Sequence, residues 1–311
     1  MPIQLDLSRS LRRWPQVLAL IGLVTVAGGL SRAKADAIVW DGEAGDGLWT
    51  TPANWSGDQV PGIEDEVSIP ESAEVVLHGS QTVLALVNGG ALWVQGGGDG
   101  NGAVLTISSN AVNRGIIRLE SVSSTWASLL FTSGKLTNSA EGVIEAKTGS
   151  GGPRSITGHL VNQGLIKSAA DYFPVLGIYE LDGGVMEGFV GLGGNGEVRI
   201  TKAPSTPAPV VLWGGTRLTT DNPPGVELWV QGGGESDGAV LTICSNAVDG
   251  GIIRLESVSS TWVSLLFTSG KLTNSAEGVI EAKTGSGGPR SITGHLVNQG
   301  LVKRAAAYFP A

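Results

Sequence analysis

Short runs of alternating apolar and polar residues recur along this chain, and an asparagine and a glycine precede each run. "GIIRLE" at 115–120, "GVIEAK" at 142–147 and "GLIK" at 164–167 start 27 and 22 residues apart. The period of two is that of a strand with one buried and one exposed face. Strands separated by polar turns at this spacing predict a β-solenoid, in which each coil buries its apolar face against the next coil.

The alternation also predicts which side chains face the interior. The inward set is Ile117, Ile144 and Ile166, and the outward set is Arg118, Glu145 and Lys167. On coils stacked about 4.8 Å apart the outward charges alternate in sign, which contributes roughly 0.2–1 kcal/mol per pair. Glu120 and Lys147 are expected to form a second pair. At the corners, asparagine and glycine are expected to accept left-handed backbone angles. Unrelated charges on a β-sandwich are the alternative interpretation.

Much of the chain is an internal duplication. Residues 92–175 and 228–311 align without gaps over 84 positions with 11 differences, and 131–165 is identical to 267–301. Such similarity indicates a recent event, so the recurrence of a residue says nothing about its importance. A solenoid tolerates duplication because added whole coils leave the contacts of each coil intact.

Composition supports an all-β fold. The 311 residues include 48 glycines, are 41% hydrophobic and are only 15% charged, which is too apolar for a disordered chain. No long amphipathic helical pattern is present. The single cysteine, Cys244, cannot form an internal disulfide. Packing and hydrogen bonds must therefore stabilise the chain.

The N-terminus has the features of a secretory signal peptide over 1–35. Three arginines precede a 14-residue apolar core at 17–30, and "AKA" at 33–35 fits a cleavage site. An uncleaved anchor is the alternative; no other apolar run is long enough to span a bilayer. Removing 1–35 takes away five basic residues and one acidic residue, which changes the net charge from −8 to −12. This charge argues against nucleic acid and anionic membranes as partners. The expected location is extracellular, on the cell surface or periplasmic.

The block after this segment resembles a known family. Residues 40–69 read "WDGEAGDGLWTTPANWSGDQVPGIEDEVSI", and the later coils read "LTNSAEGVIEAK" and "LVNQGLIKS". Both patterns resemble secreted bacterial right-handed parallel β-helix repeat proteins of the autotransporter-like and surface-adhesin type. The first block is also similar to the eight-glycine extracellular domain. The resemblance implies a right-handed parallel β-helix with an N-terminal cap, and a role as an adhesin or a cell-surface spacer.

The tryptophans of this block allow two interpretations. A solenoid needs a cover over its first coil, and Trp40, Trp49 and Trp55 are suited to forming it. Alternatively, Trp40, Trp49, Asn54 and Trp55 form a ligand-binding platform on which sugar rings pack.

The sequence motifs that could indicate catalysis or ligand binding are weak. The glycine runs at 95–102 and 231–238 are interpreted as turns, since neither has the lysine and serine or threonine of a phosphate loop. No histidine or cysteine spacing predicts a metal site, and no cofactor is expected, although the acidic chain is compatible with Ca²⁺. An ice-binding solenoid would need ladders of outward threonines, and none is evident in the sequence.

The enzyme alternative is a polysaccharide lyase or glycoside hydrolase, by analogy with other β-helices. Its active site would draw on Lys147, Arg154 and His159 and on their copies Lys283, Arg290 and His295. No cluster of carboxylates accompanies them, so catalysis is not the favoured interpretation.

The sequence therefore predicts five segments. They are a signal peptide (1–35), an N-terminal cap with the first coils (36–91), the first repeat (92–175), connecting coils with a proline-rich loop (176–227) and the second, apparently truncated repeat (228–311). The predicted function is structural or adhesive, as a spacer or a glycan-binding module whose partner is a polysaccharide or cell-wall glycan.

Overall fold

The computed structural model describes residues 37–97, 101–149, 152–233, 238–285 and 288–304, apart from the side chains at 171 and 172. The predicted signal peptide lies outside these residues. In the described chain the named strands pair in parallel, and one short 3-10 helix (Pro52–Asn54) interrupts them. The prediction of an all-β, parallel β-solenoid is confirmed.

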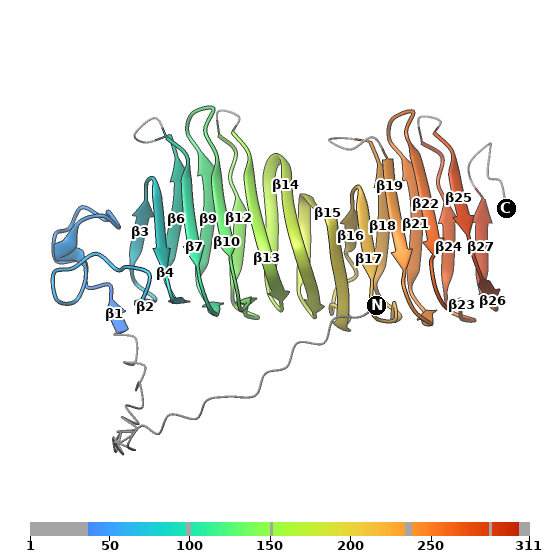
Figure 1. The fold of residues 1–311 in the computed structure, drawn as a ribbon, viewed down its shortest axis with the longest axis horizontal. Helices are drawn as coiled ribbons and strands as arrows, with labels where there is room; N and C mark the ends of the chain where they lie inside the picture. The colour runs from blue at the N-terminus through green and yellow to red at the C-terminus, as the bar shows by residue number, and fades with distance from the viewer. Residues whose placement is uncertain (1–36, 98–100, 150–151, 234–237, 286–287, 305–311) are drawn as a thin grey trace, which may run out of the picture. The chain divides into compact units, whose positions relative to one another are not determined.

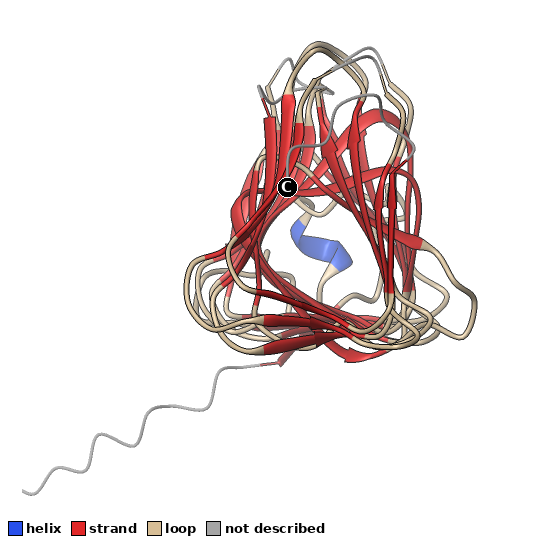
Figure 2. Cartoon of the chain, turned by 90° about the vertical axis from the view of Figure 1, so that its right-hand side faces the viewer, coloured by secondary structure: helices blue, strands red, loops and turns tan. Residues whose placement is uncertain are grey.

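Each coil places strands on three sides of the stack (Figure 2). These sides are called A, B and C, in the order in which the chain passes through them. The A strands of the first half are β3 (Glu74–Leu77), β6 (Ala91–Gly96), β9 (Ile116–Ser121) and β12 (Val143–Ala146). The B strands are β4 (Ser80–Val83), β7 (Ala103–Ile107) and β10 (Ala127–Phe131). The C strands are β1 (Ala37–Val39), β2 (Glu66–Ile69), β5 (Ala85–Asn88), β8 (Ala111–Asn113) and β11 (Leu136–Asn138).

Longer strands turn the corners in the middle of the stack (Figure 1). They are β13 (Arg154–Asn162), β14 (Leu165–Asp182) and β15 (Val185–Lys202). In the second repeat, the A strands are β18 (Glu227–Gly232), β21 (Ile252–Ser257), β24 (Val279–Ala282) and β27 (Leu301–Arg304). The B strands are β19 (Gly238–Ile243), β22 (Trp262–Phe267) and β25 (Arg290–Thr293), and the C strands are β20 (Ala247–Asp249), β23 (Leu272–Asn274) and β26 (Leu296–Asn298).

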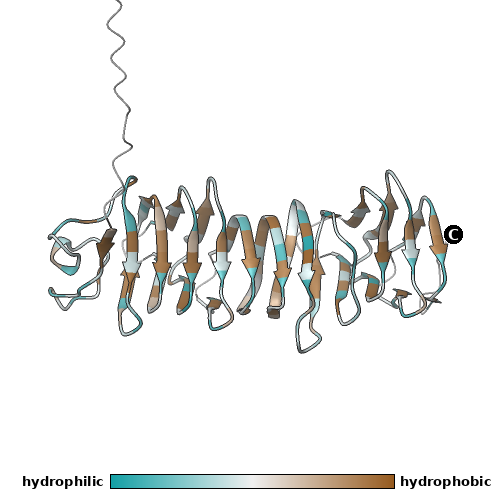
Figure 3. Cartoon of the chain, turned by 90° about the horizontal axis from the view of Figure 1, so that it is seen from below, coloured by the Kyte–Doolittle hydropathy of each residue, from teal (hydrophilic) through white to brown (hydrophobic). Residues whose placement is uncertain are grey.

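Alternation along the strands builds the core. Hydrophobic and hydrophilic residues alternate along them in Figure 3, and Ile117, Ile144 and Ile166 are all at most 1% exposed. Burial of each such side chain stabilises the fold by about 1.5–3 kcal/mol. The predicted register is also confirmed, because Glu145 pairs with Arg118 on one neighbouring coil and with Lys167 on the other.

The asparagines at the C-to-A corner form an internal ladder. The Nδ2 atoms of Asn88, Asn113 and Asn138 each donate to the Oδ1 of the asparagine on the next coil, namely Asn113, Asn138 and Asn162, at 2.8, 2.8 and 2.9 Å. All four side chains are fully buried. A ladder of this kind satisfies buried amides coil after coil.

The expected left-handed angles at these corners were wrong. The non-glycine residues with positive φ in the described chain are Asp58 and Asn195, and the ladder asparagines are not among them. The glycine that follows is needed for close packing instead. A Cβ on Gly142 would lie 2.4 Å from the carbonyl oxygen of Asn113 on the coil below, which is closer than any side chain tolerates.

A tryptophan cluster covers the first coil. The ring centroid of Trp55 lies 4.9 Å from that of Trp40 and 4.7 Å from that of Trp49. The same segment pairs with β3: the backbone N–H of Trp49 donates to the carbonyl of Val76 at 2.9 Å, and the N–H of Val76 donates to the carbonyl of Gly47 at 2.8 Å. This pairing covers a strand edge that would otherwise be open.

The stretch predicted to contain a proline-rich loop contributes two strands to the stack. It forms a further coil with β16 (Pro209–Leu212) and β17 (Gly215–Leu218). On one side, strand β16 pairs with Gly191 and Leu192, which lie in the part of β15 that continues the B ladder. On its other side it pairs with β18, an A strand of the second repeat. Likewise, β17 joins the C part of β15 to β19, a B strand. The ladder of B strands in the first repeat therefore continues as the ladder of A strands in the second, and the ladder of C strands continues as the ladder of B strands. The two repeats are thus not joined simply by the addition of whole coils.

Candidate functional site

The outward positions of the B strands in each repeat form a surface without ionisable side chains, here called the neutral face. In the first repeat it consists of Gly102, Val104, Thr106, Trp126, Ser128, Leu130, Pro153, Ser155 and Thr157. In the second repeat it consists of Gly238, Val240, Thr242, Trp262, Ser264, Leu266, Pro289, Ser291 and Thr293. The inward residues of the same strands, such as Leu105 and Leu129, are fully buried and hold the face in place.

A half-exposed tryptophan lies at one end of each neutral face. Trp126 is 50% exposed and Trp262 is 46% exposed. Each indole lies against the glycine on the preceding coil: a Cβ on Gly102 would lie 2.2 Å from Cε2 of Trp126, and a Cβ on Gly238 would lie 2.4 Å from Cε2 of Trp262. The absence of a side chain at the glycine thus lets one indole surface rest on the backbone, while about half of the side chain stays open to solvent.

Hydroxyl groups make up much of the remaining face. The Oγ atoms of Ser128 and Ser155 are 2.9 Å apart, and those of Ser264 and Ser291 are 2.7 Å apart. The adjacent column contains Thr82, Thr106 and Thr157, interrupted by Leu130. Because Leu130 interrupts it, this column is not a continuous threonine ladder. These side chains are aligned by the register of the paired B strands, and this register is hard to recognise in the sequence because the coils differ in length.

The A side of the same coils is charged. Glu145 lies 3.3 Å from Arg118 (Oε2 to Nε), 3.3 Å from Lys167 (Oε1 to Nζ) and 3.6 Å from Lys147 (Oε1 to Nζ). Burial acts to raise the pKa of the Glu145 carboxyl, but the hydrogen bond from Lys167 and the neighbouring positive charges lower it below its usual range. The expected pair of Glu120 and Lys147 is replaced, because Glu120 accepts a 2.7 Å hydrogen bond from Nε2 of Gln95.

Two residues named for catalysis lie inside the solenoid. Arg154 is 5% exposed and Arg290 is 3% exposed, so neither lies in an outward groove. The Nη1 of Arg154 donates to the carbonyl of Gly152 at 2.5 Å, and Arg290 makes the same bond to Gly288. Because these strand positions point inward, the placement supports a structural role and corrects the groove assignment.

The other four predicted catalytic residues are dispersed. Lys147 follows β12 on the A side and pairs with Glu145. His159 lies at the B-to-C bend, five residues beyond Arg154, which is about 16 Å along an extended strand. Its Nε2 lies 3.3 Å from Oε2 of Glu180. Lys283 is partly exposed and His295 is exposed at the equivalent positions of the second repeat. The six residues are not brought together as one site.

The residues predicted to form a sugar platform are buried in the cap. Trp49, Asn54 and Trp55 are fully buried, and Trp40 is 6% exposed. The Nδ2 of Asn54 donates to Oδ1 of Asp46 at 2.6 Å, and the indole N–H of Trp55 donates to the carbonyl of Trp49 at 2.7 Å. Their faces pack on one another, which agrees with the cap interpretation and leaves no ring surface for a ligand.

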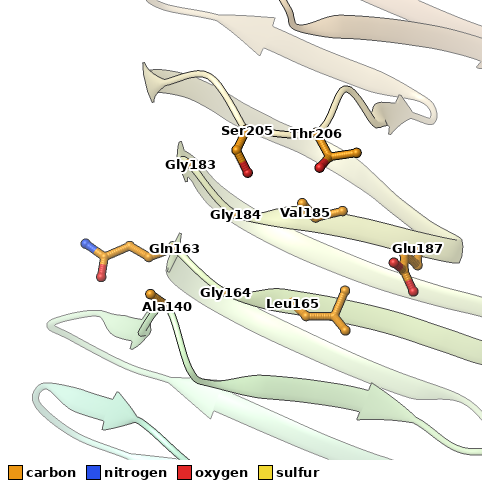
Figure 4. A pocket seen from close by; sticks show the side chains of 10 residues that line it. All are labelled: Ala140, Gln163, Gly164, Leu165, Gly183, Gly184, Val185, Glu187, Ser205 and Thr206. Carbon is orange, nitrogen blue, oxygen red and sulfur yellow. The ribbon is translucent and has the colours of Figure 1, made fainter.

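A cavity of about 330 Å³ lies where the A strands give way to the linking coil (Figure 4). Gln163 and Leu165 line it from one coil, Glu187 from the next, and Ser205 and Thr206 from the segment above. Among the described residues that line the cavity, Glu187 is the only ionisable one, so these residues do not bring together an acid and a base.

Within the described ranges, no helix is long and apolar enough to span a bilayer, and no three histidine, cysteine or carboxylate side chains group closely enough to hold a metal ion. Comparisons with protein-family models, curated proteins and solved structures found no match to this chain.

The sequence interpretation missed Trp126 and Trp262. A signal for them was present: each tryptophan directly precedes the apolar alternation of a B strand, and a glycine lies 24 residues earlier, one coil below. That spacing is visible once the coil length is known.

Proposed function

We propose that this protein is an exported, non-catalytic β-solenoid that acts as an extracellular spacer and binds an uncharged polysaccharide through its neutral faces. Export rests on the predicted signal peptide at 1–35. Binding rests on one observation above the others: a half-exposed tryptophan is held on a glycine within an uncharged sheet surface, once in each repeat.

The chemistry of the face suits a sugar ring. An indole surface is electron-rich, so it attracts the weakly positive C–H groups on the apolar face of a pyranose. The serine and threonine hydroxyls beside it can both donate and accept hydrogen bonds, as sugar hydroxyls require. An uncharged surface gives no electrostatic preference for acidic sugars, whereas the charges of the A side are already paired across the coils.

The alternative of a polysaccharide lyase or hydrolase gains no support from the six residues named for it. Arg154 and Arg290 are buried, and the others are dispersed over different sides of the coil. A lyase base and the group that holds the substrate carboxylate must both contact one sugar. We therefore retain the non-catalytic interpretation.

The test is retention of the purified protein on immobilised glucan, mannan and polygalacturonate. We expect retention on an uncharged polymer, weakened about 30-fold or more when Trp126→Ala and Trp262→Ala are combined, because exposed aromatic anchors dominate such interfaces. The matched control is Val122→Ala with Val258→Ala, since these side chains are each 45% exposed and lie outside the neutral face. Equal retention of both double variants, or steady release of reducing ends or unsaturated sugars, would overturn the proposal.

A further inference from the structure

The two neutral faces lie on the same side of the stack, although the ladders are shifted between the repeats. In Figure 1 the turn from β9 to β10 and the turn from β21 to β22 both lie along the upper edge of the stack, and Figure 2 shows that this edge is one corner of the three-sided cross-section. The coils between the repeats, from β14 to β17, must therefore turn each ladder about the long axis of the stack by about one side. This turn offsets the change from B to A strands at β16 and from C to B strands at β17. Equivalent B strands then face in the same direction.

The distance between the two tryptophans follows from the strand ladder. Strand β11 comes directly after β10, and its ladder continues through β13, β14, β15, β17 and β19 to β22. Six spacings of about 4.8 Å place the two neutral faces about 30 Å apart along the stack. On both faces the columns that contain the tryptophan, the serines and the threonines follow one another in the same order, because the chain passes through sides A, B and C in the same order in each repeat.

Resting on the proposed function, we infer that one extended polysaccharide chain binds both neutral faces at once, with Trp126 and Trp262 as its two anchors. Two sites related mainly by a translation present the same groups in the same direction. A linear polymer repeats in the same way, so one chain can satisfy both sites without reversing its polarity. A small sugar can occupy only one of them.

Simultaneous binding has a measurable consequence. When the first site holds the chain, the second site meets it at a high effective concentration, and affinity rises on the order of 10²-fold with no new type of contact. The rise requires a ligand that reaches about 30 Å, so affinity should increase in a step with ligand length rather than gradually.

The experiment is calorimetric titration of the full-length chain with β-1,4-linked glucose oligomers of graded length. We expect weak binding of short oligomers, and an affinity higher by on the order of 10²-fold once the oligomer exceeds about 30 Å. Trp126→Ala alone and Trp262→Ala alone should each remove the step and still bind short oligomers through the remaining site. The Val122→Ala and Val258→Ala variant should retain the step.

Three outcomes overturn the inference in distinguishable ways. If no oligomer of any length binds, the proposed function fails for these glucans and the inference falls with it. If short oligomers bind but affinity shows no step, the function stands and the two faces act separately. If long oligomers bring two protein molecules together in light scattering, the faces bind different chains.

Discussion

The two repeats have nearly the same sequence, yet an identical arginine keeps one equivalent glutamate partner in both and has a different second partner in each. Arg118 of the first repeat lies over Trp93, with its guanidinium carbon 4.6 Å from the ring centroid, and pairs with Glu145. Its counterpart Arg254 lies between two acids, Glu227 and Glu281. The difference arises just outside the duplication, where Ala91 corresponds to Glu227. In a solenoid, therefore, the surface charge pairing of a repeat depends on the residues that adjoin it as well as on its own sequence.

A second difference lies inside the stack. Asn113 of the first repeat is replaced by Asp249, in the interior amide ladder, where the side chain is fully buried. The Nδ2 of Asn222 donates to Oδ1 of Asp249 at 2.7 Å, and the backbone N–H of Gly251 donates to the same oxygen at 3.2 Å. Burial nevertheless dominates and raises the pKa of the Asp249 carboxyl from 3.8 to about 7. The replacement of the amide nitrogen of asparagine by the carboxyl oxygen of aspartate thus places an ionisable group in the core.

Restoring the amide is predicted to have the largest effect on stability. Because the folded-state pKa of Asp249 is raised, the unfolded chain loses this proton first, and stability falls as the pH rises from about 4 to about 7. Above pH 7 the full penalty persists and amounts to as much as about 4 kcal/mol. Asp249→Asn should remove the penalty. Urea unfolding of both proteins between pH 4 and 8 measures it as a difference that grows with pH.

The first repeat provides the mirror-image control. Asn113→Asp places a carboxyl at the equivalent ladder position, so this variant should match the parent protein near pH 4 and lose stability towards pH 8. Parallel pH profiles for the parent and the Asp249→Asn protein would show that the carboxyl is not desolvated, and would remove this distinction between the repeats.

Much of the fold was predictable because its signal is local. Alternation of apolar and polar residues identified the inward isoleucines, and the spacing of the runs identified the partners of Glu145. The tryptophan cap was predictable as well, since a first coil needs a cover. Two features of the corners were not. The glycines serve close packing between coils, and the asparagines form a side-chain ladder, and both depend on the neighbouring coil.

The candidate site was less predictable for the same physical reason. Trp126 and Arg154 both adjoin a B strand, but one points outward and the other inward, because they differ by one position in the alternation. A polar residue type suggested an exposed groove for Arg154, and only the register shows that it lies opposite the buried Ala127. The sequence interpretation likewise assigned the sugar platform to the cap tryptophans, although three adjacent tryptophans cover one another.

A smaller effect tests whether the orientation of the indole matters, apart from its presence. Gly102→Ala with Gly238→Ala keeps both tryptophans but places a methyl group where each ring rests. The rings must swing away, and glucan affinity should fall about tenfold, while the free energy of unfolding changes by about 1 kcal/mol or less because a side-chain end can move. Adding the glycine changes to the double tryptophan variant should have no further effect on binding. A further loss in that background would show that the glycines act independently of the rings.

The smallest predicted effect concerns the charge ladders. Glu145 of the first repeat has three cationic neighbours, whereas its counterpart Glu281 has an ion pair with Arg254, which it shares with Glu227. Glu145→Gln should therefore cost about 1 kcal/mol and Glu281→Gln about half of that, since partly exposed pairs contribute little each.

The pH dependence separates this effect from a change in packing. The pKa of Glu145 is lowered in the folded state, so its contribution is present above pH 4.5 and is lost as the pH falls below that value. The difference between the parent and Glu145→Gln proteins should consequently shrink in acid and in high salt. If the difference is the same at pH 3 and pH 7, it reflects lost packing, and the ladder of alternating charges contributes register rather than stability. Equal costs for Glu145→Gln and Glu281→Gln would instead show that the adjoining coil does not alter the energetics of this pairing.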